Sequence, residues 1–226
     1  MYWLSRPVIG TYTGTMLKMD VKKHCEMPNG PKIIAANHPT TTDPFFVAAM
    51  VKEQTYILIN NLLFQVPVLG EYLRRSGHIP VIAGGGQAAI DAALAHLKAG
   101  HNIMIFPEGA LSPSEGGFLR SRSGVARLAI ESGAPVVPVG ISLVREKVHS
   151  IRSVVQGKEE YGRWYIQGPY HMTVGKPVQY HGNVNDHAYV KKVADHVMHL
   201  IIELAYESEN RLKFSPSGLA KAINPV

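Results

Sequence analysis

The sequence predicts an α/β domain with a mostly parallel central sheet flanked by helices. Three observations support this fold class. Hydrophobic residues make up 46% of the 226-residue chain, which is enough apolar material for a sizeable core in one domain. Short, wholly apolar runs that suit strands buried on both faces recur along the chain. These runs alternate with segments of helical periodicity, as in folds that pack helices on a parallel sheet.

The first elements surround a polar loop. A buried strand is expected at 32–36, and a helix begins at Asp43, with Asp at its cap and Pro44 in its first turn. Another strand is expected at 56–59. The stretch 60–75 is more apolar than one core-facing stripe requires, and short helices are expected there.

The middle of the chain repeats the pattern of a strand followed by a helix. Strands are expected at 78–82, 102–106 and 135–139, and helices from about 87 to 99 and over 124–132. Apolar residues spaced four and three apart give the first helix one buried face, and a glycine follows each helix as its stop. The strand at 135–139 is expected to end at Gly140.

After this strand the pattern weakens. Residues 145–162 are polar and are expected to be mobile, and a late pair of strands is expected at 164–166 and 172–174. Apolar residues with a period near 3.6, from Val190 to Leu204, mark a terminal helix.

The chain is expected to divide into an N-terminal arm at 1–28, a domain at 29–205 and a C-terminal tail at 206–226. Apolar residues and lysines in the arm suit a membrane interface, but they equally suit packing on the domain. No segment has the roughly 20 apolar residues of a membrane-spanning helix, and the N-terminus does not resemble a signal peptide.

Charge and cysteine content restrict the partners. The net charge of +6 favours anionic partners, such as lipid headgroups, phosphorylated cofactors or an acidic carrier protein. No long run of Lys and Arg concentrates this charge, so nucleic acid is not expected. The single cysteine, Cys25, excludes an intrachain disulfide and a Cys-rich metal site, and no metal site is expected.

The loop from His38 to Asp43 follows the first buried strand, and such loops usually carry the sites of α/β folds. A carboxylate near a histidine can fix its tautomer and stabilise the imidazolium, which makes the histidine a general base. No Ser or Cys lies in a nucleophile elbow, which favours direct attack by an acceptor hydroxyl. The alternative is structural: an Asp before Pro is also what an ordinary helix cap looks like.

A second loop follows another buried strand and adds a further motif, which brings the ordered motif matches to four. They are Asn37, His38 and Asp43; Gly77, Ile79, Pro80 and Val81; Phe106, Pro107, Glu108, Gly109 and Ser112; and the Pro- and Val-rich strand 134–139. With these matches, residues 29 to 180 resemble the phospholipid/glycerol acyltransferase family, in particular its 1-acylglycerol-3-phosphate acyltransferase group.

This resemblance implies an enzyme that moves a fatty acyl group from acyl-CoA or acyl carrier protein to a hydroxyl of a lipid or glycerol-type acceptor. His38 would be the general base and Asp43 would orient it, while Glu108, Gly109 and Ser112 would help to bind the acceptor. No cofactor beyond the thioester co-substrate is implied. The enzyme would work at the cytoplasmic face of a membrane, peripherally. A lipid-to-lipid transacylase and an inactive lipid-binding module of the same fold are the alternatives.

The chain departs from the family pattern where the resemblance implies two arginines near an acceptor phosphate. Ala83 and Leu111 occupy those positions, and neither can replace a guanidinium. Either the acceptor lacks a phosphate there, or other groups supply the charge. Candidates are Arg120 and Arg122, for which a solvated surface pair is the alternative, and the amides of the glycine triplet at 84–86, for which a flexible turn is the alternative.

An acyl chain needs an apolar channel, because each buried methylene contributes roughly 0.8 kcal/mol. Surplus apolar residues that could line one, or could be ordinary core, are Phe45, Phe46, Leu62, Leu63, Phe64, Val66 and Val68.

Overall fold

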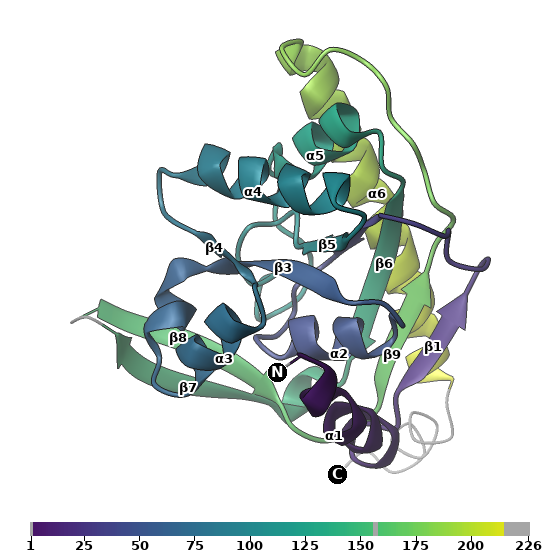
Figure 1. The fold of residues 1–226 in the computed structure, drawn as a ribbon. Coiled ribbons are helices and arrows are strands. Elements are labelled where there is room, and N and C mark those ends of the chain that lie inside the picture. The colour runs from purple at the N-terminus through teal and green to yellow at the C-terminus, as the bar shows by residue number, and fades with distance from the viewer. Residues whose placement is uncertain (1, 156–157, 215–226) are drawn as a thin grey trace.

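The central sheet of the computed structural model, which describes residues 2–155 and 158–214, has seven strands in the order β1-β9-β6-β2-β5-β3-β4 (Figure 1). The strands are β1 (Asp20–Lys23), β2 (Ile33–Ala36), β3 (Thr55–Asn60), β4 (Ile79–Val81), β5 (Asn102–Ile105), β6 (Val136–Leu143) and β9 (Tyr170–Val174). All neighbouring strands are parallel except β6 and β9. The predicted α/β fold class with a mostly parallel sheet is confirmed.

Helices cover both faces of the sheet (Figure 1). They are α1 (Tyr2–Thr15), α2 (Asp43–Ala49), α3 (Leu69–Arg75), α4 (Gly86–Lys98), α5 (Gly124–Ser132) and α6 (His187–Lys213), with short 3-10 helices η1 (Asn61–Gln65) and η2 (Arg145–Lys147). Side chains alternate along β2, so Ile33 and Ala35 join the core under α4, α5 and α6. Ile34 and Ala36 join the core on the α2 and α3 side. Burial on both faces explains why this strand is a continuous apolar run.

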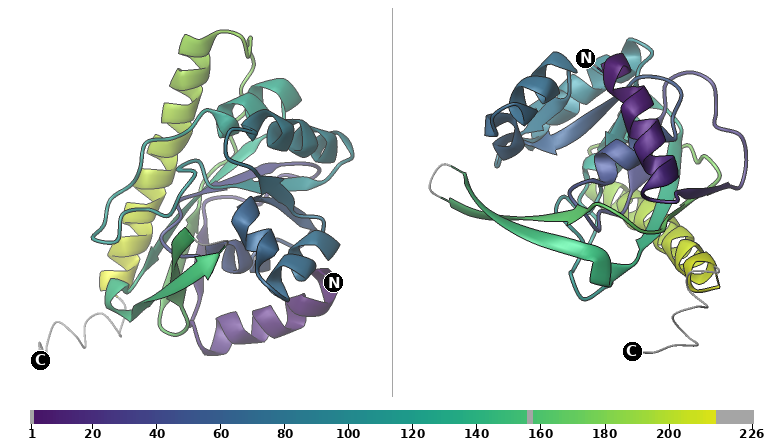
Figure 2. Two further views of the ribbon diagram at one scale, coloured as in Figure 1. Left: turned by 90° about the vertical axis from the view of Figure 1, so that its left-hand side faces the viewer. Right: turned by 90° about the horizontal axis from the view of Figure 1, so that it is seen from below.

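The polar segment at 145–162 forms a hairpin rather than a mobile stretch. Strand β7 (Val148–Val155) pairs antiparallel with β8 (Lys158–Tyr165), and the pair extends away from the body of the molecule (Figures 1 and 2). Ile151 and Tyr161 are half-exposed or more, because the hairpin has little protein to cover it. Both late strands are present: Trp164 and Tyr165 lie in β8 and 172–174 lie in β9. They do not pair with each other, because β8 pairs with β7 and β9 pairs with β6 and β1.

The ends of the chain also differ from the expected boundaries. Strand β1 pairs with β9 and Leu17 is fully buried, so the segment 1–28 is in part a component of the sheet. Helix α6 continues to Lys213, so residues 206–213 are helical rather than a tail. The rest of the expected tail, from 215 to 226, lies outside the described residues.

Strand β6 continues through Gly140 to Leu143, although a stop at the glycine is expected from sequence. The glycine marks the point where α6 crosses the strand: a Cβ at Gly140 would lie 2.0 Å from the backbone nitrogen of Ala205. Glycine is therefore required here because only a hydrogen atom fits in place of a side chain, and not because the chain turns.

Gly140→Ala should therefore lower the free energy of unfolding by about 3 kcal/mol, since helix α6 must move away from the sheet. Urea denaturation followed by circular dichroism would measure this loss. Gly86→Ala, at the start of α4 with nothing within 4 Å of its Cβ, is the matched control and should not destabilise the protein. Equal stability of Gly140→Ala and the wild type would contradict this packing.

A second prediction concerns His78, which precedes β4 and is 6% exposed. Its Nδ1 accepts a hydrogen bond from the Ile57 amide, and burial lowers the pKa of His78 to about 4. Above about pH 6.5 the ring is neutral in both the folded and unfolded chain. Below that, the unfolded chain binds the proton first, so stability falls as the pH drops towards 4, by up to about 3 kcal/mol.

His78→Gln keeps an acceptor for the amide but removes the titrating group. Unfolding free energies measured between pH 7 and 4.5 should fall less steeply for this variant than for the wild type. Parallel pH profiles would show that His78 does not contribute.

Candidate active site

Two neighbouring strands deliver the predicted site residues to one edge of the sheet. Strands β2 and β5 are parallel and adjacent, so their carboxyl ends meet. His38 follows β2 by two residues, and Glu108 follows β5 by three. The Asn37 side chain fixes the end of β2 against β6: its oxygen accepts from the amide of Ile141 and its nitrogen donates to the carbonyl of the same residue. This edge is where open α/β sheets bind ligands.

The imidazole of His38 contacts the carboxylate of Asp43, with 3.1 Å between Nδ1 and Oδ2. The Asp43 side chain is fully buried, whereas that of His38 is 18% exposed. A carboxylate at Nδ1 favours the tautomer that carries its proton there, which leaves the Nε2 lone pair available to accept another. The ring also stacks on Phe106, with centroids 4.1 Å apart, and this contact fixes its plane.

Asp43 does not cap helix α2 as expected. It is the first residue of the helix, and its carboxylate is directed back into the preceding loop. One oxygen accepts from the Thr40 amide at 2.7 Å, and the other accepts from the Thr40 hydroxyl at 2.6 Å and from Tyr170 at 2.8 Å. Burial, and then the adjacent Asp43 charge, raise the pKa of Tyr170 well above its usual value, so this phenol remains a donor. The carboxylate is therefore held at four points, with the imidazole as the only partner of these that reaches solvent.

The buried side chain of Glu108 links the loop after β2 to the loop after β5 through hydrogen bonds. One of its oxygens accepts from the His38 amide at 3.0 Å and from the Ser112 hydroxyl at 2.6 Å, and the other accepts from the Leu119 amide at 2.7 Å. The side chain is 2% exposed, as is that of Ser112. Both oxygens are thus used by the protein itself. This geometry fits a residue that positions His38, whereas the resemblance implies contact with the acceptor.

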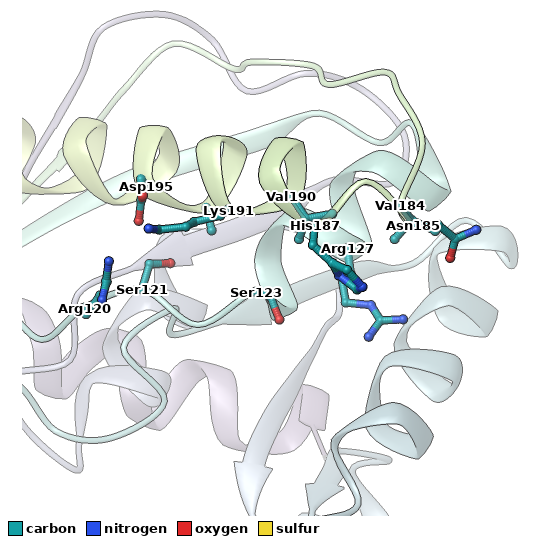
Figure 3. A pocket seen from close by; sticks show the side chains of 11 residues that line it. Arg120, Ser121, Ser123, Arg127, Val184, Asn185, His187, Val190, Lys191 and Asp195 are labelled. Atoms are coloured by element: carbon teal, nitrogen blue, oxygen red, sulfur yellow. The ribbon is translucent and has the colours of Figure 1, made fainter.

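The structure separates Arg120 from Arg122. The Arg122 side chain lies across Gly109, which has φ +67°, and a Cβ on that glycine would approach the Arg122 Cδ to 2.5 Å. Arg120 instead lines a pocket of about 470 Å³ between α5 and the start of α6, and Figure 3 shows it facing Lys191 and Asp195. Other lining residues are Ser121, Ser123, Arg127, Val184, Asn185, His187, Val190 and Ala194. Neither His38 nor Asp43 lines this pocket.

The β7–β8 hairpin adds residues that no sequence motif indicated. The amide of Thr41 donates to the carbonyl of Arg163 at 2.7 Å, and the Arg163 amide donates to the Thr41 hydroxyl at 3.0 Å. The guanidinium of Arg163 donates to the carbonyl of Ser112. Strand β8 thus lies against the loop that carries the His38–Asp43 pair, and it reaches the second loop through this arginine.

The apolar residues considered for an acyl channel do not all line one space. Phe46 and Phe64 are buried in the core on the α2 side, whereas Val68 is 87% exposed. The glycine triplet forms a turn in which Gly84 has φ +79°, and α4 begins at Gly86.

Within the described residues, no group of three or more His, Cys, Asp or Glu side chains could hold a metal ion. In that same part of the chain, no helix is long and apolar enough to cross a membrane.

Comparisons with known proteins identify the family of the chain. A family profile described as "Acyltransferase" matches residues 18–142, more than half of the chain. The 1-acyl-sn-glycerol-3-phosphate acyltransferase of Salmonella typhimurium is 28% identical over 138 residues, covering 59% of this chain and 56% of that protein. The enzyme of the same name from Saccharomyces cerevisiae is 32% identical, covering 56% and 44%.

A lyso-ornithine lipid O-acyltransferase from Pseudomonas aeruginosa is 28% identical, covering 70% of this chain and 59% of that protein. The chain thus spans about half the length of the curated relatives it matches. The crystal structure of a 1-acyl-sn-glycerophosphate acyltransferase from Thermotoga maritima superimposes with a TM-score of 0.60, at 22% identity, over 88% of this chain and 79% of that one. This likeness shows a shared fold.

Proposed function

Because the chain belongs to the acyltransferase family, we propose that it transfers a fatty acyl group from a thioester donor to a hydroxyl of a lipid or glycerol-type acceptor. The donor would be acyl-CoA or acyl carrier protein. The observation that carries the proposal is the contact between His38 and a buried, multiply hydrogen-bonded Asp43 at the carboxyl edge of the sheet. This arrangement suits proton abstraction from an alcohol.

The proposed reaction has one proton relay. Nε2 of His38 accepts the proton of the acceptor hydroxyl as its oxygen attacks the thioester carbonyl carbon. The Asp43 carboxylate stabilises the imidazolium through the Nδ1 proton. As the tetrahedral intermediate collapses, the carbon–sulfur bond breaks, and the imidazolium returns the proton to the leaving thiolate. The products are an ester and a free thiol, and no covalent enzyme intermediate is needed.

The proposed place of work is the cytoplasmic face of a membrane, without crossing it. The substrates would be lipids, and a net charge of +6 favours anionic headgroups. Val8 on α1 is 71% exposed and Met16, just after it, is 45% exposed, which offers apolar contacts to an interface.

The test is an acyl-transfer assay in which the purified protein is given acyl-CoA, acyl carrier protein or a diacyl phospholipid as donor. Lysophosphatidate, lyso-ornithine lipid and monoacylglycerol serve as acceptors, and mass spectrometry identifies the products. Ester formation with one thiol released per product supports the proposal. Product from the phospholipid donor alone would indicate a transacylase. Vesicle binding without transfer from any donor would indicate an inactive lipid-binding module.

A further inference from the structure

Two arginines that no motif indicated lie beside the proposed catalytic loop. The guanidinium of Arg163 donates to the carbonyl of Ser112, and the amide of the same serine donates to the carbonyl of His38 at 2.8 Å. Ser112 therefore connects the Arg163 guanidinium to the backbone of His38, the proposed base. Arg145 approaches the residues that follow Ser112 in the second loop, with its Nη1 3.5 Å from the carbonyls of Pro113 and Ser114.

The positive charge of this pair is not neutralised by direct contacts. Neither guanidinium forms an ion pair with another residue that the structure describes, and their hydrogen-bond partners are neutral carbonyl groups. The nearest buried carboxylates, Asp43 and Glu108, have both oxygens occupied by other donors. The pair thus keeps donors and charge for an external group.

The electrostatics show that the two cations share one region. Partial burial lowers the pKa of Arg163, and the charge of Arg145 lowers it further, while Asp43 and Glu108 act in the opposite direction. Glu115, an exposed residue, has a pKa lowered by hydrogen bonds from its own amide and Ser114, and then by both arginines. Two like charges held close together cost free energy, and an anion between them would offset that cost.

We propose that Arg163 and Arg145 form a subsite for an anionic headgroup of the acceptor, of the phosphate monoester class. This inference rests on the proposed acyl transfer. A guanidinium presents a planar fork that matches a phosphate, and two forks suit a dianion better than one. The subsite supplies cations in a chain that has Ala83 and Leu111 at the positions where the resemblance implies arginines.

The pocket between α5 and α6 provides an internal comparison. Its Arg120, Arg127 and Lys191 also attract anions, but its lining includes neither residue of the proposed catalytic pair. Arg163 is linked to His38 through a single residue, Ser112, and Arg145 contacts the two residues that follow this serine. An anion held by Arg163 would therefore lie beside the loop that carries His38.

The experiment is calorimetric binding, which does not depend on turnover, with two water-soluble ligands that differ only in the phosphate. They are hexanoyl lysophosphatidate and monohexanoylglycerol. The wild type should bind the phosphate-bearing ligand roughly 10- to 100-fold more tightly. Arg163→Ala and Arg145→Ala should each lose most of this preference and leave binding of the neutral ligand unchanged. Arg163→Lys, which keeps the charge without the fork, should restore part of it.

Arg120→Ala, in the separate pocket, is the matched control and should keep the full preference. Thermal melts verify folding, and Arg145→Ala gives an answer even if the Ser112 contact proves necessary for stability. Equal affinity of the wild type for both ligands would overturn the subsite, as would a preference lost only in Arg120→Ala. A loss confined to binding of CoA relative to dephospho-CoA would instead assign the arginines to the donor. Failure of acyl transfer with intact phosphate preference would refute the proposed function alone.

Discussion

Replacing His38 with alanine should reduce the rate of acyl transfer by roughly 10³-fold or more while the protein stays folded. A positioned general base contributes about 10²- to 10⁴-fold, and the Nε2 atom of this ring is the group that would accept the hydroxyl proton. The variant should remain stable because Asp43 keeps its bonds to Thr40 and Tyr170. Rates should be measured as ester product by mass spectrometry, since free Cys25 would add background to a thiol assay.

The variant His38→Gln distinguishes the contribution of the side chain's shape from its contribution to proton transfer. Glutamine occupies much of the same volume over Phe106 and can form a hydrogen bond with Asp43, but it cannot act as a base at neutral pH. It should be as inactive as the alanine variant. A rate within tenfold of the wild type in either variant would remove His38 from the mechanism.

The buried strands of the sheet could be predicted because they are covered on both faces. A run such as Ile33 to Ala36 has to be apolar at every position, and this pattern is visible without an alignment. The hairpin cannot be predicted in this way, for the opposite reason. Its strands are covered by little protein, so no apolar alternation marks them, and only the backbone pairing between β7 and β8 defines them.

Gly140 shows a second limit of sequence patterns. A glycine after an apolar run ordinarily indicates the end of a strand. Here it allows α6 to cross β6 at close distance, and the partner atom belongs to Ala205, 65 residues later. A pattern local to the strand has no information on a helix that arrives from so far along the chain.

Short spacing made the contact of His38 with Asp43 predictable, because five residues of loop can bring the two side chains together. The remaining partners of Asp43 could not be found in this way. Tyr170 lies in β9, which β6 separates from β2 in the sheet order, and it is 127 residues away from Asp43 in the sequence. The same holds for Arg163, which reaches Ser112 from a hairpin that the sequence did not predict.

Asp43→Asn should lower the rate of acyl transfer by up to about 10³-fold through loss of charge rather than loss of geometry. The amide has one oxygen, and the neighbouring donors decide where it lies. The Thr40 amide can only donate, so it requires an oxygen at the position of Oδ2. The hydroxyls of Thr40 and Tyr170, at the position of Oδ1, can accept as well as donate and so tolerate the NH₂ group. His38 then keeps its Nδ1 partner and tautomer.

What the variant lacks is the negative charge opposite the imidazolium. At about 4 Å and an effective dielectric constant near 20, such a pair is worth about 4 kcal/mol, which corresponds to about three powers of ten in rate. Steady-state kinetics measure the loss, and nitrogen NMR of the His38 ring tests whether the Nδ1 proton remains. Tyr170→Phe is the matched control, because it removes one bond to the same carboxylate and keeps the charge; its rate should fall less than tenfold. If Asp43→Asn and Tyr170→Phe proved equally active, Asp43 would organise the loop without assisting proton transfer.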